Sequence, residues 1–426
     1  MSFAKNTSVY LISNILNAAA PFLLLPLLTR WLGPEGYGKV AMFQTLIAGM
    51  LALIGINTVG AASRKYYDDM SREELGRFNF SCIYILFFTL ILSIIMIFTF
   101  GDIISVFLNI QVKWIYAAIV IAFFTYIINF RLVQWQVRNK AMKYCGLQVS
   151  NALLGMLATL FLVKMYSFGE QGRVDALLYT SAIFSLISVC LLIKDKLLII
   201  TGLRYDYISE ALKFGVPLTP HVFGAFLLSA ADRFVINDEL GVKFAGIYMV
   251  SVQVSMALAI IFDAINKAYV PWLFSRLKNC SMTGKYEIVK NTYLYFISLL
   301  VVSGCAFFIG PLVIELVVNE DFYMAKDVIG WLCLGQVFGG MYLMVTNYIF
   351  YEKSTTALSI VTIACGLGNL LLMLLFIGPF GVNGVAFAFV ISKLIQFLVT
   401  WVLANKVYPM PWLSFLLNKN GIEHVR

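Results

Sequence analysis

Charged residues are scarce in this chain. Asp, Glu, Lys and Arg make up 12% of the 426 residues, whereas hydrophobic residues make up 61%. Together with a mean hydropathy of +0.87, this composition excludes an ordinary soluble domain. The apolar stretches are continuous rather than alternating with polar residues, which excludes a transmembrane β-barrel. We therefore expect an all-α, polytopic membrane protein.

The residues that usually carry catalysis or bind metals are also few. Histidine occurs only at His221 and His424, and the chain has no phosphate-binding loop, no nucleophile-elbow motif and no paired-histidine zinc motif. The seven cysteines are odd in number and lack metal-ligand spacing, so we expect free apolar thiols rather than a disulfide framework or a metal site. We predict a protein that is not an enzyme and that uses no cofactor and no metal.

About twelve apolar segments are long enough to cross a bilayer, which needs roughly 20 residues per helix. The first six are predicted at residues 8–31, 37–62, 79–100, 113–130, 145–166 and 174–193. The second six are predicted at residues 208–231, 244–265, 291–310, 327–350, 358–376 and 382–404. We therefore predict an N-terminal six-helix bundle at 1–193, a cytoplasmic interfacial linker at 194–207, a C-terminal six-helix bundle at 208–404 and a cytoplasmic tail at 405–426. The mixture of basic and apolar residues at 192–210 predicts a helix lying on the cytoplasmic surface.

Basic residues gather on one side of the predicted membrane. The loops on the side of the N-terminus carry 22 Lys and Arg residues, the opposite side carries 8, and Lys393 lies within a span. By the positive-inside rule both termini are expected in the cytoplasm. The net charge of +9 therefore indicates topology rather than nucleic-acid binding.

The segment at 21–43 returns in a looser form at 226–251. In each copy an apolar run ends on an arginine, Arg30 or Arg233, and a short polar loop leads to a glycine and an aromatic residue that open the next apolar run. The pattern predicts an internal repeat that begins two similarly built halves.

Prolines occur inside the first and seventh predicted spans, as Pro21 with Pro26 and as Pro217 with Pro220. A proline inside a helix frees a carbonyl group, which is tolerated in lipid where neighbours or a water-filled cavity satisfy it. Interrupted helices at corresponding places in two halves indicate the central site of a transporter, although ordinary packing kinks would also explain them. His221 directly follows the second pair.

Two charged positions stand out within spans. Lys393 lies close to the middle of the last span, where insertion of a lysine costs roughly 2.5–3.5 kcal/mol, so it needs a partner or a water-filled cavity unless it snorkels. Asp263 and Lys267 lie four residues apart on one helical face, which favours an intrahelical ion pair and leaves open a protonatable coupling group. The basic and aromatic loop at 130–145 predicts contact with anionic headgroups, or alternatively an inner vestibule.

Several stretches resemble the Wzx-type polysaccharide flippases, notably LLTRWLGPEGYGKVAMFQ, RNKAMKYCGLQVSN, the ADRFVIN…FAGIYMVSVQVS…AYVPWLF pattern of spans seven and eight, and GPFGVNGVAFAFVISK. These flippases belong to the superfamily that includes multidrug and toxin extrusion transporters and peptidoglycan lipid flippases. The resemblance implies two six-helix bundles around a central cavity and export by alternating access. The implied substrate is an undecaprenyl-pyrophosphate-linked oligosaccharide, such as an O-antigen repeat unit of lipopolysaccharide, which moves from the inner to the outer leaflet of a bacterial inner membrane. By helix position, the resemblance also implies that Arg30, Arg233 and Lys393 are basic residues of the cavity.

Polar residues within spans are candidates for binding sugar hydroxyls, and helix packing is an equally good explanation of them. They are Asn14, Asn17, Gln44, Asn57 and His221. The expected partners are the lipid-linked oligosaccharide, membrane lipids and other polysaccharide assembly proteins, without nucleic acid. A cation-coupled drug exporter of the same superfamily would favour an acidic cavity. A membrane polysaccharide polymerase or glycosyltransferase, from a different class, would show a long external loop.

Overall fold

The computed structural model describes residues 3–68, 70–278, 281–352 and 354–412, and within these ranges it contains helices and no strand. This confirms the predicted all-α class. Ten helices in the described ranges are long and apolar enough to cross a membrane. The chain is therefore a multi-pass membrane protein.

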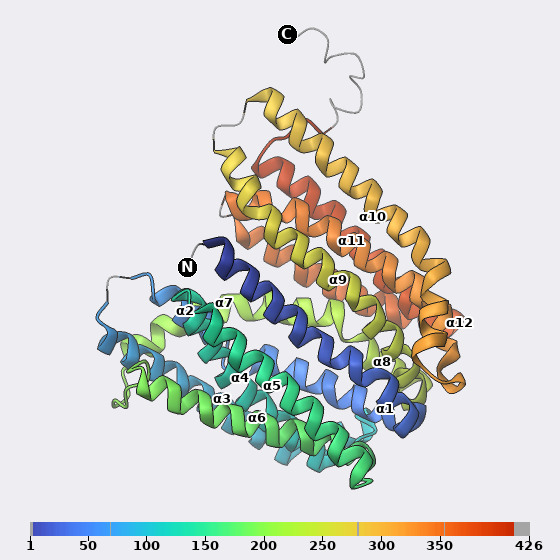
Figure 1. Cartoon of the computed structure of the whole chain (residues 1–426), viewed down its shortest axis with the longest axis horizontal. Helices are drawn as coiled ribbons and strands as arrows, with labels where there is room; N and C mark the ends of the chain where they lie inside the picture. Colours follow the sequence, from blue (N-terminus) through green and yellow to red (C-terminus); the bar gives the residue numbers. More distant parts are fainter. Residues whose placement is uncertain (1–2, 69, 279–280, 353, 413–426) are drawn as a thin grey trace. The chain divides into compact units, whose positions relative to one another are not determined.

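Two of these ten helices are each long enough for two spans, α1 (Phe3–Leu53) and α12 (Thr355–Val407). Each contains one glycine with non-helical angles, Gly33 (φ 66°, ψ 179°) and Gly381 (φ 57°, ψ −138°). Near Gly381 the carbonyl oxygen of Phe376 touches Gly384, although eight residues of straight helix would separate them by about 12 Å. The chain thus reverses within α12, and the ribbon of α1 turns back in the same way (Figure 1). Counted in this way, the spans agree with the expected number of about twelve.

The residues of the chain cluster into two compact units. The first comprises residues 1–250 and 317–324, and the second comprises 251–316 and 325–426. The first unit therefore includes α7 (Tyr205–Ser229) and α8 (Asp232–Leu240) as well as the six preceding predicted spans. The two six-helix bundles at 1–193 and 208–404 stay a prediction.

In the first unit, α1 packs against α4 (Val112–Val137), α5 (Ala141–Leu160) and α6 (Gly169–Lys194), while α3 (Arg72–Leu108) packs against α4 (Figure 1). α5 continues into the π-helical segment η1 (Phe161–Met165). α3 begins with a capping box, in which Ser71 Oγ accepts a hydrogen bond from Glu74 N and Glu74 Oε2 accepts one from Ser71 N. These contacts fix the helices that surround the polar residues described below.

The second predicted span, 37–62, is interrupted rather than continuous. α1 ends at Leu53, a left-handed turn follows at Gly55 (φ 76°), Ile56 (φ 46°) and Asn57 (φ 50°), and the short helix α2 covers Thr58–Lys65. The backbone groups freed at Gly55 find side-chain partners within the unit. Its N–H donates to Thr89 Oγ1 (3.0 Å), and its carbonyl accepts from Thr58 Oγ1 (2.9 Å) and Tyr126 Oη (3.2 Å). Side chains thus satisfy a break in a membrane-spanning segment, as the lack of water in lipid requires.

The predicted surface helix at 192–210 is wrong, because α6 ends at Lys194 and α7 begins at Tyr205. The segment between them is held by α3 instead. Asn79 Nδ2 donates to the Leu197 carbonyl (2.8 Å), Tyr84 Oη donates to the Thr201 carbonyl (2.9 Å), and Ile199 N donates to the Gly76 carbonyl (3.2 Å). Hydrogen bonds to α3 thus replace those that a helix would form within itself. The mixture of basic and apolar residues in the segment gives no sign of these distant partners.

The second unit is built from most of α9 (Val242–Leu277), α10 (Met282–Val317), α11 (Lys326–Tyr351) and α12, and the 3₁₀ helix η2 (Glu320–Ala325) precedes α11. α11 packs along α12. Its core includes the buried side chains of Phe296, Val345, Tyr348 and Phe397.

Candidate functional site

Asn14 and Asn17, the two asparagines predicted in the first span, have different surroundings. Asn14 Oδ1 accepts hydrogen bonds from Tyr144 Oη (3.3 Å) and Gln148 Nε2 (3.2 Å), and Ser13 Oγ donates to Gln148 Oε1 (2.8 Å). Asn14 therefore joins α1 to α5, which is the helix-packing role. Asn17, one turn further along α1, lines a pocket instead.

This pocket has a volume of about 220 Å³ and lies between α1, α4, α5 and α6. Its polar lining combines amides, hydroxyls and one guanidinium. These groups belong to Asn17, Thr125, Asn151, Arg173, Thr180 and Ser181. The pocket therefore brings several polar groups together between four membrane-spanning helices of the first unit.

Arg173 is the charged group of this pocket. Its side chain is only 7% exposed, and Nη1 donates a hydrogen bond to Thr159 Oγ1 (2.6 Å). Its Nε and the Oδ1 atom of Asn151 are buried without a hydrogen-bond partner. Among the described residues, no carboxylate lies within ion-pair distance of the guanidinium. A buried cation with a vacant donor is costly, and an anionic or strongly accepting ligand would stabilise it.

The sequence did not single out Arg173 as a site residue. The sixth predicted span begins at residue 174 and so leaves Arg173 in the loop before it, whereas α6 begins at Gly169. Gly172 allows this start to pack closely, since a Cβ there would stand 2.8 Å from the carbonyl carbon of Leu162. Because the start of α6 packs against η1, Arg173 is buried. In the sequence, its polar neighbours suggest an exposed position.

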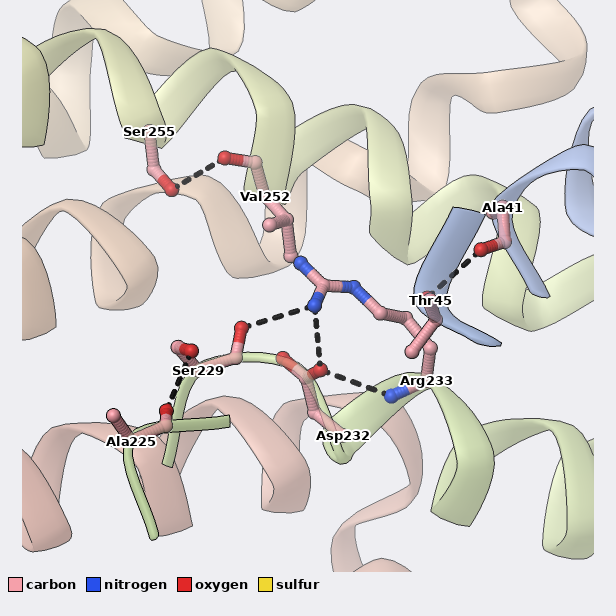
Figure 2. Close-up of polar contacts among 8 residues, drawn as sticks. All are labelled: Ala41, Thr45, Ala225, Ser229, Asp232, Arg233, Val252 and Ser255. Atoms are coloured by element: carbon pink, nitrogen blue, oxygen red, sulfur yellow. Dashed lines mark hydrogen bonds and ion pairs between the residues drawn. The ribbon is translucent and has the colours of Figure 1, made fainter. Parts of the chain in front are cut away.

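Arg233, a predicted cavity residue, is buried in α8 and already paired (Figure 2). Its Nη1 donates to the Ser229 carbonyl (2.9 Å) and lies 3.3 Å from Asp232 Oδ1, which also accepts from Arg233 N (2.9 Å). Its Nε has no hydrogen-bond partner. The pairing explains how the α7–α8 turn buries a cation, and it leaves Arg233 less available to a substrate than Arg173.

The remaining candidates of the first unit do not gather at the pocket. Arg30 is exposed near the end of the first half of α1, and Gln44 is partly buried in the second half. Asn57 lies in the left-handed turn before α2, and His221 lies in α7 with its Nδ1 buried and without a hydrogen-bond partner. Among the polar residues predicted to bind sugar hydroxyls, Asn17 lines the pocket.

The second unit contains the other charged candidates. Lys393 is partly buried in α12, and its Nζ lies 5.6 Å from the centroid of the Phe389 ring. None of the ion pairs among the described residues includes Lys393. Asp263 and Lys267 form the expected intrahelical ion pair at 2.6 Å, with side chains 48% and 53% exposed. His424 and Cys280 lie outside the described residues.

The part of the chain that the structure describes is an all-helical, multi-pass membrane protein with buried polar groups between its spans. Its fold is similar to the inward-facing conformation of a multidrug resistance MATE family transporter of the MOP superfamily. That structure has a TM-score of 0.71 at 15% identity, over 98% of this chain and 97% of that one. An outward-facing structure of such a transporter has a TM-score of 0.62 at 16% identity, over 94% and 95%. The eukaryotic MATE transporter AtDTX14 has a TM-score of 0.63 at 14% identity, over 97% of both chains.

The chain belongs to the polysaccharide biosynthesis protein family, whose sequence model matches residues 3–278. It is 26% identical over 366 residues to Lsg locus putative protein 1 of Haemophilus influenzae, which covers 84% of this chain and 87% of that protein. An uncharacterized membrane protein of the same organism is 26% identical over 377 residues, covering 84% and 86%. The family predicted from the sequence is therefore confirmed.

Proposed function

We propose that this protein is a flippase that moves an undecaprenyl-pyrophosphate-linked oligosaccharide from the inner to the outer leaflet of a bacterial inner membrane. Membership of the polysaccharide biosynthesis family supports the saccharide substrate, and the fold shared with multidrug transporters supports export. The observation that carries the proposal is the buried Arg173 guanidinium, which lines a pocket between four helices and has no carboxylate partner among the residues that the structure describes.

The chemistry of the substrate requires such groups. A pyrophosphate cannot cross hydrocarbon unaided, because the desolvation of its charge is very costly. Arginine binds phosphate oxygens in a bidentate manner, and lysine acts as a mobile point charge, which suits Arg173 and Lys393. Amides such as Asn17 and Asn151 can exchange hydrogen bonds with sugar hydroxyls or with the water around them.

The direction of transport agrees with the membrane potential. Moving one negative charge out of a negative-inside cell is favoured by about 2.3 kcal/mol per 100 mV. Cationic side chains that return during the cycle offset part of this gain. We propose alternating access as the mechanism, with both termini in the cytoplasm, because solved structures of this fold include inward-facing and outward-facing conformations of a related transporter class.

A cation-coupled drug exporter is the second candidate, because the fold is that of multidrug transporters. Such an exporter needs a carboxylate that is free to exchange a proton or to bind a cationic drug. Asp232 is buried but paired with Arg233, and Asp263 is half exposed and paired with Lys267. These two carboxylates are thus neutralised by their neighbours, whereas none of the ion pairs among the described residues includes Arg173, and this contrast supports an anionic substrate. We further propose that the protein transports rather than catalyses, and that it works beside other polysaccharide assembly proteins, as in O-antigen synthesis.

The leaflet distribution of the lipid-linked oligosaccharide tests the proposal. We would delete the gene in cells without a redundant flippase and probe oriented inner-membrane vesicles with a lectin specific for the sugar. The substrate should accumulate on the cytoplasmic leaflet in the deletion strain and return to the outer leaflet when the wild-type gene is restored. Normal outer-leaflet substrate in the deletion strain would refute the flippase function.

A substitution series tests the role of Arg173 in the same vesicles. Arg173→Gln should lower the outer-leaflet signal at least tenfold at equal protein abundance, because the loss of a charge-assisted phosphate contact costs about 1.5–3 kcal/mol. Arg276→Gln is the matched control, since Arg276 lies in the last turn of α9 and is exposed. Equal export by Arg173→Gln and wild type would remove Arg173 from the site.

A further inference from the structure

A second pocket lies on the first unit where α4 ends and α5 begins, outside the polar pocket described above. Its volume is about 510 Å³, and its walls come from α4, α5 and α6. Three cations, Arg131, Lys143 and Lys194, and one carboxylate, Asp195, line it. The lining is therefore cationic overall, at the end of the unit that the basic loops predict to be cytoplasmic.

The buried end of this pocket holds hydrogen-bond donors without acceptors. Arg131 is 1% exposed, its Nη2 donates to Asp195, and its guanidinium carbon lies 4.1 Å from the centroid of the Trp135 ring. Its Nε and Nη1 and the Nε1 of Trp135 are buried without a hydrogen-bond partner. Three vacant donors, two of them on a cation, fit the oxygens of a phosphate group, which Arg binds with particular geometric match.

The rest of the pocket is apolar and follows the helix axes away from the charged end. Phe184, Ile187 and Leu191 precede Lys194 on α6, so the lining runs along about 15 Å of helix. Beside it, the outer faces of α5 and α6 expose large apolar side chains such as Leu157 (57%) and Leu186 (67%). A ligand with an anionic head and a hydrocarbon tail would satisfy both ends of the pocket, and it can enter from the bilayer.

We propose that this pocket binds one anionic phospholipid of the leaflet at that end. The phosphate accepts hydrogen bonds from Arg131 and Trp135, Lys143 and Lys194 flank the headgroup, and an acyl chain lies along the apolar lining. Asp195 orients the Arg131 guanidinium through Nη2 and leaves the other donors for the lipid. The site does not depend on which substrate the protein exports.

Native mass spectrometry of the purified, delipidated chain tests the site, with phosphatidylglycerol and phosphatidylcholine as probes. One phosphatidylglycerol should bind at least tenfold more tightly than phosphatidylcholine. The double substitution Lys143→Ala with Lys194→Ala should weaken its binding about 20- to 30-fold, because each basic residue near a lipid surface contributes roughly fivefold in affinity. Lys213→Ala with Lys290→Ala, two exposed lysines outside the pocket, should leave the affinity within twofold of wild type.

A second variant blocks the pocket without changing its charge. A Cβ on Gly146 would meet no atom within 4 Å, so Gly146→Phe can place its ring in the pocket that Gly146 lines, and we expect at least tenfold weaker phosphatidylglycerol binding. Gly304→Phe is the matched control, because Gly304 also has open space at its Cβ and lies on α10. It should bind the lipid as the wild type does.

Several outcomes would overturn the proposal. One is equal affinity for the two phospholipids, and another is wild-type phosphatidylglycerol binding by both pocket variants. A third is an equal loss in the control lysine pair, which would indicate general surface charge. Displacement by glycerol phosphate at similar concentrations would show that only a soluble phosphate is recognised, and displacement by polyprenyl phosphate at a tenfold lower concentration would assign the pocket to the export substrate.

Discussion

The interrupted second span yields a quantitative prediction at Gly55. This residue has a φ of 76°, and a Cβ added to it would overlap the ring of Tyr126. Gly55→Ala therefore meets a conformational cost and a steric cost together. Gly169→Ala separates the two, because Gly169 has a φ of 55° and open space within 4 Å of its Cβ position.

The expected magnitudes follow from these two terms. A left-handed conformation costs a residue with a Cβ about 1–2 kcal/mol, which is the whole loss expected for Gly169→Ala. Overpacking against a buried ring adds about 1–3 kcal/mol, so Gly55→Ala should lose about 2–5 kcal/mol of unfolding free energy. Adding Tyr126→Leu to Gly55→Ala should cost less than the sum of the single substitutions, because the smaller side chain removes the overlap.

Unfolding in mixed micelles, followed by circular dichroism across a titration with a denaturing detergent, measures these differences. The comparison needs equal slopes for wild type and variants, so that the midpoints report stability. A loss in Gly55→Ala no greater than in Gly169→Ala, or strictly additive costs in the double variant, would refute the tight packing of Tyr126 on the break.

Three further predictions concern other parts of the chain. Lys393→Ala should lower export in the vesicle assay without lowering the amount of protein in the membrane, since Lys393 forms none of the ion pairs among the described residues. Asn17→Leu should lower export with little change in the unfolding free energy, because Asn17 lines the pocket and the larger side chain can extend into that space. Burial raises the pKa of the Asp195 carboxyl, but the hydrogen bond and charge of Arg131 outweigh it and hold that pKa below its ordinary value. The stabilisation from this pair is therefore complete above the unfolded pKa of about 3.9 and declines as the pH falls through the lower folded value. Asp195→Asn should cost about 2 kcal/mol at pH 7 and flatten this acid dependence in unfolding titrations.

Each of these three predictions has a result that contradicts it. Full export by Lys393→Ala would show that the lysine merely reaches the interface. A large loss of stability in Asn17→Leu would assign Asn17 to helix packing, as the hydrogen bonds of Asn14 already indicate for that residue. If the stability of the Asp195→Asn variant fell with acid as much as that of the wild type, the acid dependence would come from another group.

The sequence predicted those features of the fold that depend on hydrophobicity alone. Length and composition indicated an all-helical membrane protein with about twelve spans, because hydrocarbon enforces both the length and the continuity of apolar segments. The break at Gly55 escaped prediction because its backbone partners, Thr89 and Tyr126, lie 34 and 71 residues away. The surface helix predicted at 192–210 was wrong for the same reason, since the partners of this segment lie on α3.

The candidate site shows the same limit. Asn14 and Asn17 were predicted within the first span and do lie on α1, but only the packing of α5 and α6 shows that Asn14 is hydrogen-bonded and that Asn17 lines a pocket. Arg233 was selected by its place in the repeat and proves to be paired with Asp232. Arg173 and Arg131, which are buried with vacant donors, looked from the sequence like loop residues on opposite sides of the membrane.

The segment between α6 and α7 also has a consequence for biosynthesis. The Asn79 amide donates to the Leu197 carbonyl, which is synthesised 118 residues later in the chain. At roughly 5–20 residues per second, the ribosome needs on the order of 10 s to deliver that partner. The nascent protein therefore inserts α3 with polar groups still open to other partners, and these groups find their native partners only after the segment between α6 and α7 has left the ribosome.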